Sequence, residues 1–235
     1  MRFPSFALTL MAASMSLMVG GLDITHPLMA AQPPQPSQKI SLKFKLPKRA
    51  APVAGVVGGA TRNFCVAGNL PLATLTPPNR LGLTTGSRPT FYLHVPQTSA
   101  KSAELVIKDI NNQDVYRTSF PLDRNTSGIM SVQLPESAPP LEVNQYYRWY
   151  FSLVCRPSDR LEDVFVSAWV QRIEPDRGLA QALQQTNVRQ RASLYAENGV
   201  WYDALSSLVQ LRRLNPNDPK VTTEWSEFLE SVGLE

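Results

Sequence analysis

Hydrophobic and polar side chains alternate most regularly along residues 146–155. One face of this segment collects Tyr147, Trp149, Phe151, Leu153 and Cys155. Successive side chains of a β-strand point to opposite faces of the sheet, so an alternation of period two is typical of a strand with one buried face. The pattern predicts a strand over 146–155 whose odd-numbered residues line the core.

The opposite face of the same segment carries Tyr146, Arg148 and Tyr150. Amphipathic aromatic rings that flank a cation are favoured at binding surfaces. The sequence therefore offers these three residues as a candidate binding stripe. The alternative is that they pack under the C-terminal part of the chain.

Six further segments show strand-like patterns, and they predict a mainly β protein. They span residues 40–46, 90–95, 103–109, 114–120, 128–134 and 164–173. Short strands separated by proline and glycine turns, without helical crossovers, favour an antiparallel β-sandwich of the immunoglobulin or fibronectin type. Leu141 lies six residues before Tyr147, a spacing similar to the tyrosine corner of such sandwiches, in which the hydroxyl binds upstream backbone.

From residue 176 onward the period becomes helical. Residues 185–218 resemble one tetratricopeptide repeat, with Gly199 at the turn between two helices, Ala204 at the close-packed small position and Pro216 at the end of the second helix. A stable solenoid needs about three or more such repeats. We therefore expect residues 179–234 to form a small helical bundle against or beside the sandwich.

The N-terminus has the pattern of an export signal. Met1 and Arg2 supply a positive start, and residues 6–19 are uncharged and largely apolar. A membrane anchor is the alternative, but a spanning helix needs roughly 20 apolar residues. We expect a signal peptide over residues 1–31, a proline-rich spacer over 32–38, a β-sandwich domain over 39–175, a helical region over 176–235, and no transmembrane span after cleavage.

The two cysteines, Cys65 and Cys155, also bear on the compartment in which the protein works. In an oxidising compartment an even pair most simply forms one disulfide, while two buried free thiols are the alternative. A bridge across such a long loop stabilises the fold by about 4 to 5 kcal/mol in the chain-entropy treatment. We expect a periplasmic or extracellular location.

Charge is distributed unevenly. Residues 24–103 contain nine basic and no acidic residues, whereas residues 104–235 contain 13 basic and 18 acidic residues. The basic part could bind anionic groups, or the two parts could neutralise each other within one fold. The apolar fraction of 43% excludes full disorder. Nucleic acid is not an expected partner of an exported chain.

Few residues could support catalysis or metal binding. His94 would be the sole imidazole after removal of the signal, which leaves too few ligands for a histidine-rich metal centre, and we expect no cofactor. Asp159, Glu162 and Asp163 could serve a glycosidase, which needs two carboxylates. A solvated, charge-balanced hairpin that also includes Arg156 and Arg160 is the simpler interpretation.

Several motifs together resemble the cyanobacterial domain-of-unknown-function family 928. They lie at residues 58–65, 89–96, 140–155, 164–173 and 194–205, and the resemblance covers roughly residues 40–234. It implies an exported cyanobacterial protein with no assigned activity, so no catalytic residue is carried over.

These patterns predict a non-enzymatic binding or adaptor protein of the periplasm or cell envelope. Its partner would be another envelope protein or an acidic glycan. The alternatives are a carboxylate-dependent, glycan-active envelope enzyme and a structural component of an export or surface assembly.

Overall fold

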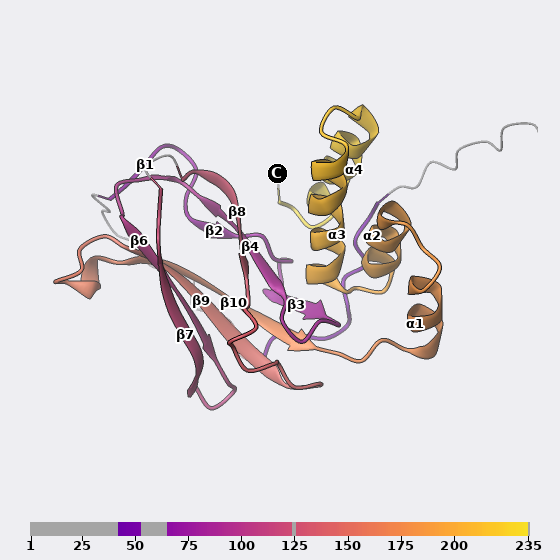
Figure 1. Ribbon diagram of the computed structural model, residues 1–235, viewed down its shortest axis with the longest axis horizontal. Coiled ribbons are helices and arrows are strands. Elements are labelled where there is room, and N and C mark those ends of the chain that lie inside the picture. The colour runs from indigo at the N-terminus through magenta and orange to yellow at the C-terminus, as the bar shows by residue number, and fades with distance from the viewer. Residues whose placement is uncertain (1–41, 53–64, 124–125, 235) are drawn as a thin grey trace, which may run out of the picture. The chain divides into compact units, whose positions relative to one another are not determined.

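The computed structural model describes residues 42–52, 65–123 and 126–234 (Figure 1). The expected signal peptide and spacer lie outside these residues. Within the described part the chain forms three β-sheets followed by four helices. The strands are β1 (Val66–Ala67), β2 (Ala73–Thr74), β3 (Leu81–Thr84), β4 (Thr90–Val95), β5 (Gln97–Thr98), β6 (Ser102–Lys108), β7 (Asp114–Pro121), β8 (Gly128–Gln133), β9 (Tyr146–Val154) and β10 (Val164–Arg172).

The largest sheet has the strand order β3-β10-β9-β6-β7. β9 lies at its centre and pairs antiparallel with both β10 and β6. β3 pairs parallel with β10, with Leu81 opposite Trp169, so this sheet is mixed rather than purely antiparallel as predicted. A parallel pair needs a long connection, and the chain between β3 and β10 provides one.

A smaller sheet with the order β2-β4-β8 faces the large one. The two sheets contact each other through aromatic rings. The Phe91 ring of β4 stacks on Trp149 of β9, with ring centroids 4.8 Å apart. The predicted inward face of β9 is confirmed, because Trp149, Phe151 and Leu153 are fully buried and Tyr147 nearly so. Full burial of each such side chain contributes about 1.5–3 kcal/mol to folding.

The predicted strand over residues 40–46 is wrong for the residues that the structure describes. Residues 42–46 have no regular secondary structure, although Leu42 and Phe44 are buried and Lys43 is exposed as the alternation predicts. The partners of this extended segment are helical. The Phe44 amide donates to Ser231 Oγ at 3.0 Å, and the Lys45 amide donates to the Ala196 carbonyl at 3.1 Å.

The C-terminal helices are α1 (Arg177–Leu183), α2 (Val188–Glu197), α3 (Trp201–Leu214) and α4 (Pro219–Glu230). Side chains cap three of their N-termini: Asp176 for α1, Asn187 for α2 and Asp218 for α4. A cap satisfies amides that have no partner within the helix. Among the described residues no helix combines the length and apolar character needed to cross a membrane.

Helix α3 is built into the core of the β-sheets. The Trp201 indole donates to the Leu75 carbonyl at 2.8 Å, and the Tyr92 hydroxyl donates to Ser206 Oγ at 3.2 Å. A Cβ atom placed on Gly82 of β3 would lie 2.3 Å from the Tyr202 ring. Sheets and helices therefore share one hydrophobic core.

The turn between α2 and α3 depends on Gly199, which has a φ of +70°. Replacing it with alanine would place Cβ 2.9 Å from the Lys45 carbonyl oxygen and would force a side chain into the left-handed region. We expect Gly199→Ala to lower the free energy of unfolding by about 2 kcal/mol, as measured by chemical denaturation.

Gly233→Ala is the matched control for this change. Gly233 has a φ of +72°, but a Cβ atom there would meet nothing within 4 Å. The control therefore carries the backbone strain without the contact. Equal losses in the two variants would show that the approach of residue 45 to the turn contributes nothing.

Candidate functional site

The candidate stripe lies on the outer face of the large sheet, opposite the buried face of β9. Tyr146, Arg148 and Tyr150 are each half-buried. The pairing register sets Arg148 between Lys108 of β6 and Trp169 of β10. Alternation along β9 thus brings the three predicted residues to one face, beside the side chains of two neighbouring strands.

Arg148 is the centre of this face. Its guanidinium carbon lies 5.0 Å from the Tyr150 ring centroid and 5.7 Å from that of Trp169. Its Nη2 donates to Ser167 Oγ at 3.1 Å. Arg148 Nε and Trp169 Nε1 are both buried without a hydrogen-bond partner among the described residues. A guanidinium between aromatic rings is held in place and still retains donor capacity.

One end of the same face is covered by the segment that follows residue 47. Arg49 Nη1 donates to Gln171 Oε1 at 3.0 Å, and Ala51 packs against the apolar cluster around Trp169. Helix α3 reaches the opposite face of the sheet, where the Tyr202 hydroxyl accepts from the Trp149 indole at 2.8 Å. Helix α3 therefore packs on the face of β9 opposite the stripe, not over it.

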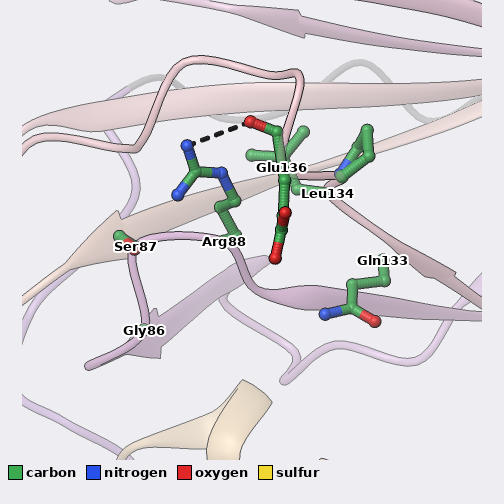
Figure 2. Close-up of a pocket in the computed structure, with 7 residues that line it drawn as sticks. Gly86, Ser87, Arg88, Gln133, Leu134 and Glu136 are labelled. Carbon is green, nitrogen blue, oxygen red and sulfur yellow. Dashed lines mark hydrogen bonds between the residues drawn. The ribbon is translucent and has the colours of Figure 1, made fainter.

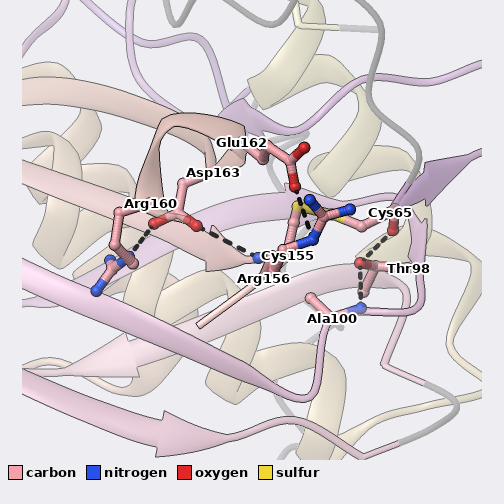
Figure 3. The surroundings of a disulfide bond; sticks show 8 residues. All are labelled: Cys65, Thr98, Ala100, Cys155, Arg156, Arg160, Glu162 and Asp163. Atoms are coloured by element: carbon pink, nitrogen blue, oxygen red, sulfur yellow. Dashed lines mark hydrogen bonds and ion pairs between the residues drawn. A yellow bond between two sulfur atoms is a disulfide. The ribbon is translucent and has the colours of Figure 1, made fainter. Parts of the chain in front are cut away.

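The predicted disulfide between Cys65 and Cys155 is confirmed, with the two Cα atoms 5.5 Å apart (Figure 3). It joins the residue before β1 to the residue after β9. The Cys65 carbonyl accepts from the Thr98 hydroxyl at 2.7 Å, while the Cys155 amide donates to Asp163 Oδ1 at 3.3 Å. The bridge therefore fastens the small β1–β5 pair to the end of the large sheet.

The candidate catalytic carboxylates lie in the connection between β9 and β10, and Figure 3 shows Glu162 and Asp163. Asp159 caps a short 3₁₀ helix, η1 (Arg160–Glu162), by accepting from the Leu161 amide. Asp163 forms an ion pair with Arg160 at 2.5 Å, and Glu162 forms one with Arg156 at 3.2 Å.

Arg160 also connects this hairpin to the neighbouring strand β6. Its Nη2 lies 3.1 Å from Glu104 Oε1, and the hydrogen bond with Asp163 raises the pKa of its guanidinium. Glu104 in turn pairs with Arg117 of β7 at 2.9 Å. The carboxylates are thus occupied by arginine and backbone donors, as expected for a charge-balanced hairpin.

His94, the sole imidazole expected after removal of the signal, lies on β4. Its Nδ1 is 2.8 Å from the Pro71 carbonyl oxygen, so this ring nitrogen is occupied by backbone. Within the described part of the chain no group of three or more histidine, cysteine or acidic side chains could hold a metal ion.

The sequence patterns did not reveal two adjoining hollows near the turn that follows β3. The larger, of about 530 Å³, is lined by residues 86–88 and 133–136 (Figure 2). The smaller, of about 260 Å³, lies between that turn and helices α2 and α3. Both include Gly86 and Arg88.

Asp203 of α3 lines the smaller hollow and is hydrogen-bonded to Thr85, the residue that follows β3. Its carboxylate accepts from the Thr85 hydroxyl at 2.6 Å and from the Thr85 amide at 3.2 Å. Burial raises the pKa of Asp203, and hydrogen bonds from Thr85 and Thr84 oppose that shift. Burial likewise raises the pKa of Tyr195, with a further contribution from the negative charge of Asp203.

The fold and the bridge define a mainly β, disulfide-bonded protein with antiparallel sheets and a C-terminal helical region. Residues 57–235 match the family described as Domain of Unknown Function (DUF928), and the chain belongs to this family. No curated protein matches the chain.

Proposed function

We propose that this protein is an exported, non-enzymatic binding or adaptor protein of the periplasm or cell envelope of a cyanobacterium. The disulfide supports export, because such bonds persist in oxidising compartments. The partner is another envelope protein or an acidic glycan, bound by Tyr146, Arg148 and Tyr150.

The observation that carries this proposal is the environment of the Arg148 guanidinium. Its guanidinium lies against Tyr150 and Trp169, and of its two terminal nitrogens only Nη2 is hydrogen-bonded to a described residue, through Ser167 Oγ. Tyrosine, tryptophan and arginine are the residues most enriched where binding energy concentrates in protein interfaces. A cation fixed by aromatic rings on an outer sheet face fits an acidic or carbonyl-rich partner.

The finer description of the scaffold belongs to the same proposal. An immunoglobulin- or fibronectin-like sandwich is supported by the stacking of Phe91 on Trp149. It is also supported by the Tyr147 hydroxyl, which accepts from the upstream Glu142 amide at 3.2 Å as a tyrosine corner would. A single tetratricopeptide-like helix pair is supported by α2 and α3 with Gly199 between them.

The carboxylate-dependent enzyme remains the alternative, and the geometry disfavours it. General acid and base groups need access to a substrate in a hollow between them. Glu162 and Asp163 instead pair with arginines of the same hairpin, and the residues of that hairpin line neither of the two hollows.

Alanine replacement of Tyr146, Arg148 and Tyr150 together tests the proposed surface. We expect at least a tenfold loss in stoichiometric co-purification of one envelope component, because hot-spot residues typically contribute 2 kcal/mol or more. The thermal midpoint should fall by less than about 5 °C, since the stripe is only half-buried.

A double variant on the other sheet serves as the control. Ile129→Ala with Ser131→Ala removes two exposed side chains of β8 and should leave capture unchanged. Unaltered capture by the triple variant would refute the proposed surface. A large fall in its thermal midpoint would instead identify the three residues as packing residues.

A further inference from the structure

The two hollows that share Gly86 and Arg88 form a polar depression on the described part of the chain, separate from the outer sheet face. Their volumes, about 530 and 260 Å³, are close to those of small-molecule sites, roughly 300–1,000 Å³. Most of the side chains that line the smaller hollow are polar, whereas typical sites for drug-like ligands are mostly apolar. Such a lining favours a hydrophilic ligand over a lipid or a flat aromatic molecule.

Several polar groups that line the smaller hollow form hydrogen bonds within the protein. Asp203 accepts from Thr85, and Ser207 Oγ donates to the Asp203 carbonyl at 2.8 Å. Ser206 is hydrogen-bonded to the Tyr92 hydroxyl. These bonds connect β3, β4 and α3 around the hollow and give it a preformed wall.

Other groups that line the smaller hollow still have hydrogen-bonding capacity for a ligand. The side chains of Arg191, Thr90 and Gln210 form no hydrogen bond or ion pair with the residues that the structure describes. Arg88 donates through Nη2 to the Glu136 carbonyl (Figure 2) and through Nε to the Ala138 carbonyl, each at 3.2 Å, which leaves its Nη1 available. The smaller hollow therefore combines two guanidinium groups with a hydroxyl and an amide.

Charge is separated along the depression. Arg191 lines only the smaller hollow, and Glu136 lines only the larger one. The Asp203 carboxylate also lines the smaller hollow and opposes an anion, but the guanidinium groups of Arg88 and Arg191 outnumber it, and its oxygens already accept from Thr85 and Thr84. An anionic group is thus favoured in the smaller hollow, and uncharged hydroxyl groups are favoured toward the larger one.

We infer that this depression binds an acidic sugar unit of a glycan. Arg191 receives the carboxylate, because a guanidinium donates two parallel hydrogen bonds to that group, and Arg88 adds positive charge. Thr90 and Gln210 bind ring hydroxyls, and the half-buried Tyr195 offers a ring against the sugar. This site is independent of the proposed function at Tyr146, Arg148 and Tyr150.

Calorimetric titration of the full chain with trigalacturonic acid tests the inference. The fully methyl-esterified trimer has the same skeleton without charge, and sodium sulfate supplies an anion without hydroxyls. We expect the acid trimer to bind at least tenfold more tightly than either of these probes. Arg191→Gln should weaken its binding at least tenfold, and Gln210→Ala about threefold.

Arg177→Gln makes the same change in charge at an exposed position of α1 outside both hollows and should leave the affinity within twofold. Far-ultraviolet circular dichroism confirms that each variant is folded. No binding of the acid trimer, equal binding of the esterified trimer, or no effect of both Arg191→Gln and Gln210→Ala would overturn the inference. Sulfate binding as tight as that of the trimer would reduce the site to a simple anion site and also overturn it.

Discussion

Replacing Cys65 and Cys155 with serine is expected to lower the free energy of unfolding by about 4 to 5 kcal/mol. The two residues are 90 positions apart, so the bridge removes a large loop-closure entropy from the unfolded chain. For a chain of this size the thermal midpoint should fall by about 10–15 °C. Chemical denaturation of the double variant and of the wild type measures the difference.

Loss of the disulfide should also loosen the region around Cys65. The Cys65 carbonyl accepts from Thr98 and Ser99, and these bonds hold β1 beside β5. Reductant is the control, because it should destabilise the wild type by a similar amount and leave the serine variant unaffected. A loss below about 1 kcal/mol would mean that the sheets hold this region without the bridge.

The second large effect is expected at Tyr202, where helix and sheets meet. Its hydroxyl accepts from the Trp149 indole at 2.8 Å and donates to the Trp169 carbonyl at 3.3 Å. The ring meets Phe91 edge-on, with centroids 5.4 Å apart, and is almost fully buried. Tyr202→Ala should therefore lower the free energy of unfolding by about 4 kcal/mol, because it removes the ring and leaves the buried Trp149 donor without an acceptor.

Two companion variants separate the components of this loss. Tyr202→Phe keeps the ring but leaves the Trp149 donor unpaired, so about 1–3 kcal/mol is expected. Gly82→Ala alone should destabilise by overpacking, since its Cβ would lie 2.3 Å from the Tyr202 ring. In a double-mutant cycle the Gly82→Ala change should lose most of its effect when Tyr202 is alanine. Additive losses would show that β3 and α3 do not pack as described.

Hydrophobic and polar patterning allowed six strands of the fold to be predicted from the sequence. β9 is the clearest case, because its buried residues recur at every second position from Tyr147 to Leu153, whereas β10 is buried continuously from Ser167 to Gln171. β1, β2 and β5 contain two residues each, too few to show a period. β3 is buried throughout and contains Gly82, which makes room for Tyr202. Its sequence therefore shows no alternation from which a strand could be predicted.

The error at residues 40–46 has a specific physical cause. Leu42 and Phe44 are buried as an alternating strand would bury them, yet Phe44 contacts Trp201 and Phe228 of the helices, with ring centroids 4.9 and 5.9 Å away. Alternation reports an extended backbone with one buried side. It does not report whether the neighbour is a strand or a helix.

The two candidate surfaces differ in how far the sequence reveals them. Tyr146, Arg148 and Tyr150 share one strand, so their period brings them to one face. The hollows are lined by residues between Thr84 and Gln210, from the turn after β3, the end of β8, and helices α2 and α3. Only tertiary packing brings such distant residues together.

A photo-crosslinking residue at position 150 gives the most direct test of the central claim, that the outer face of β9 binds a partner. Tyr150→p-benzoylphenylalanine places the probe on the stripe, and Ile129→p-benzoylphenylalanine places it on the exposed face of β8 as a control. On irradiation in intact cells, the proposal predicts one discrete envelope adduct from position 150 and none of that mass from position 129. No adduct from position 150, or the same adducts from both positions, would contradict it.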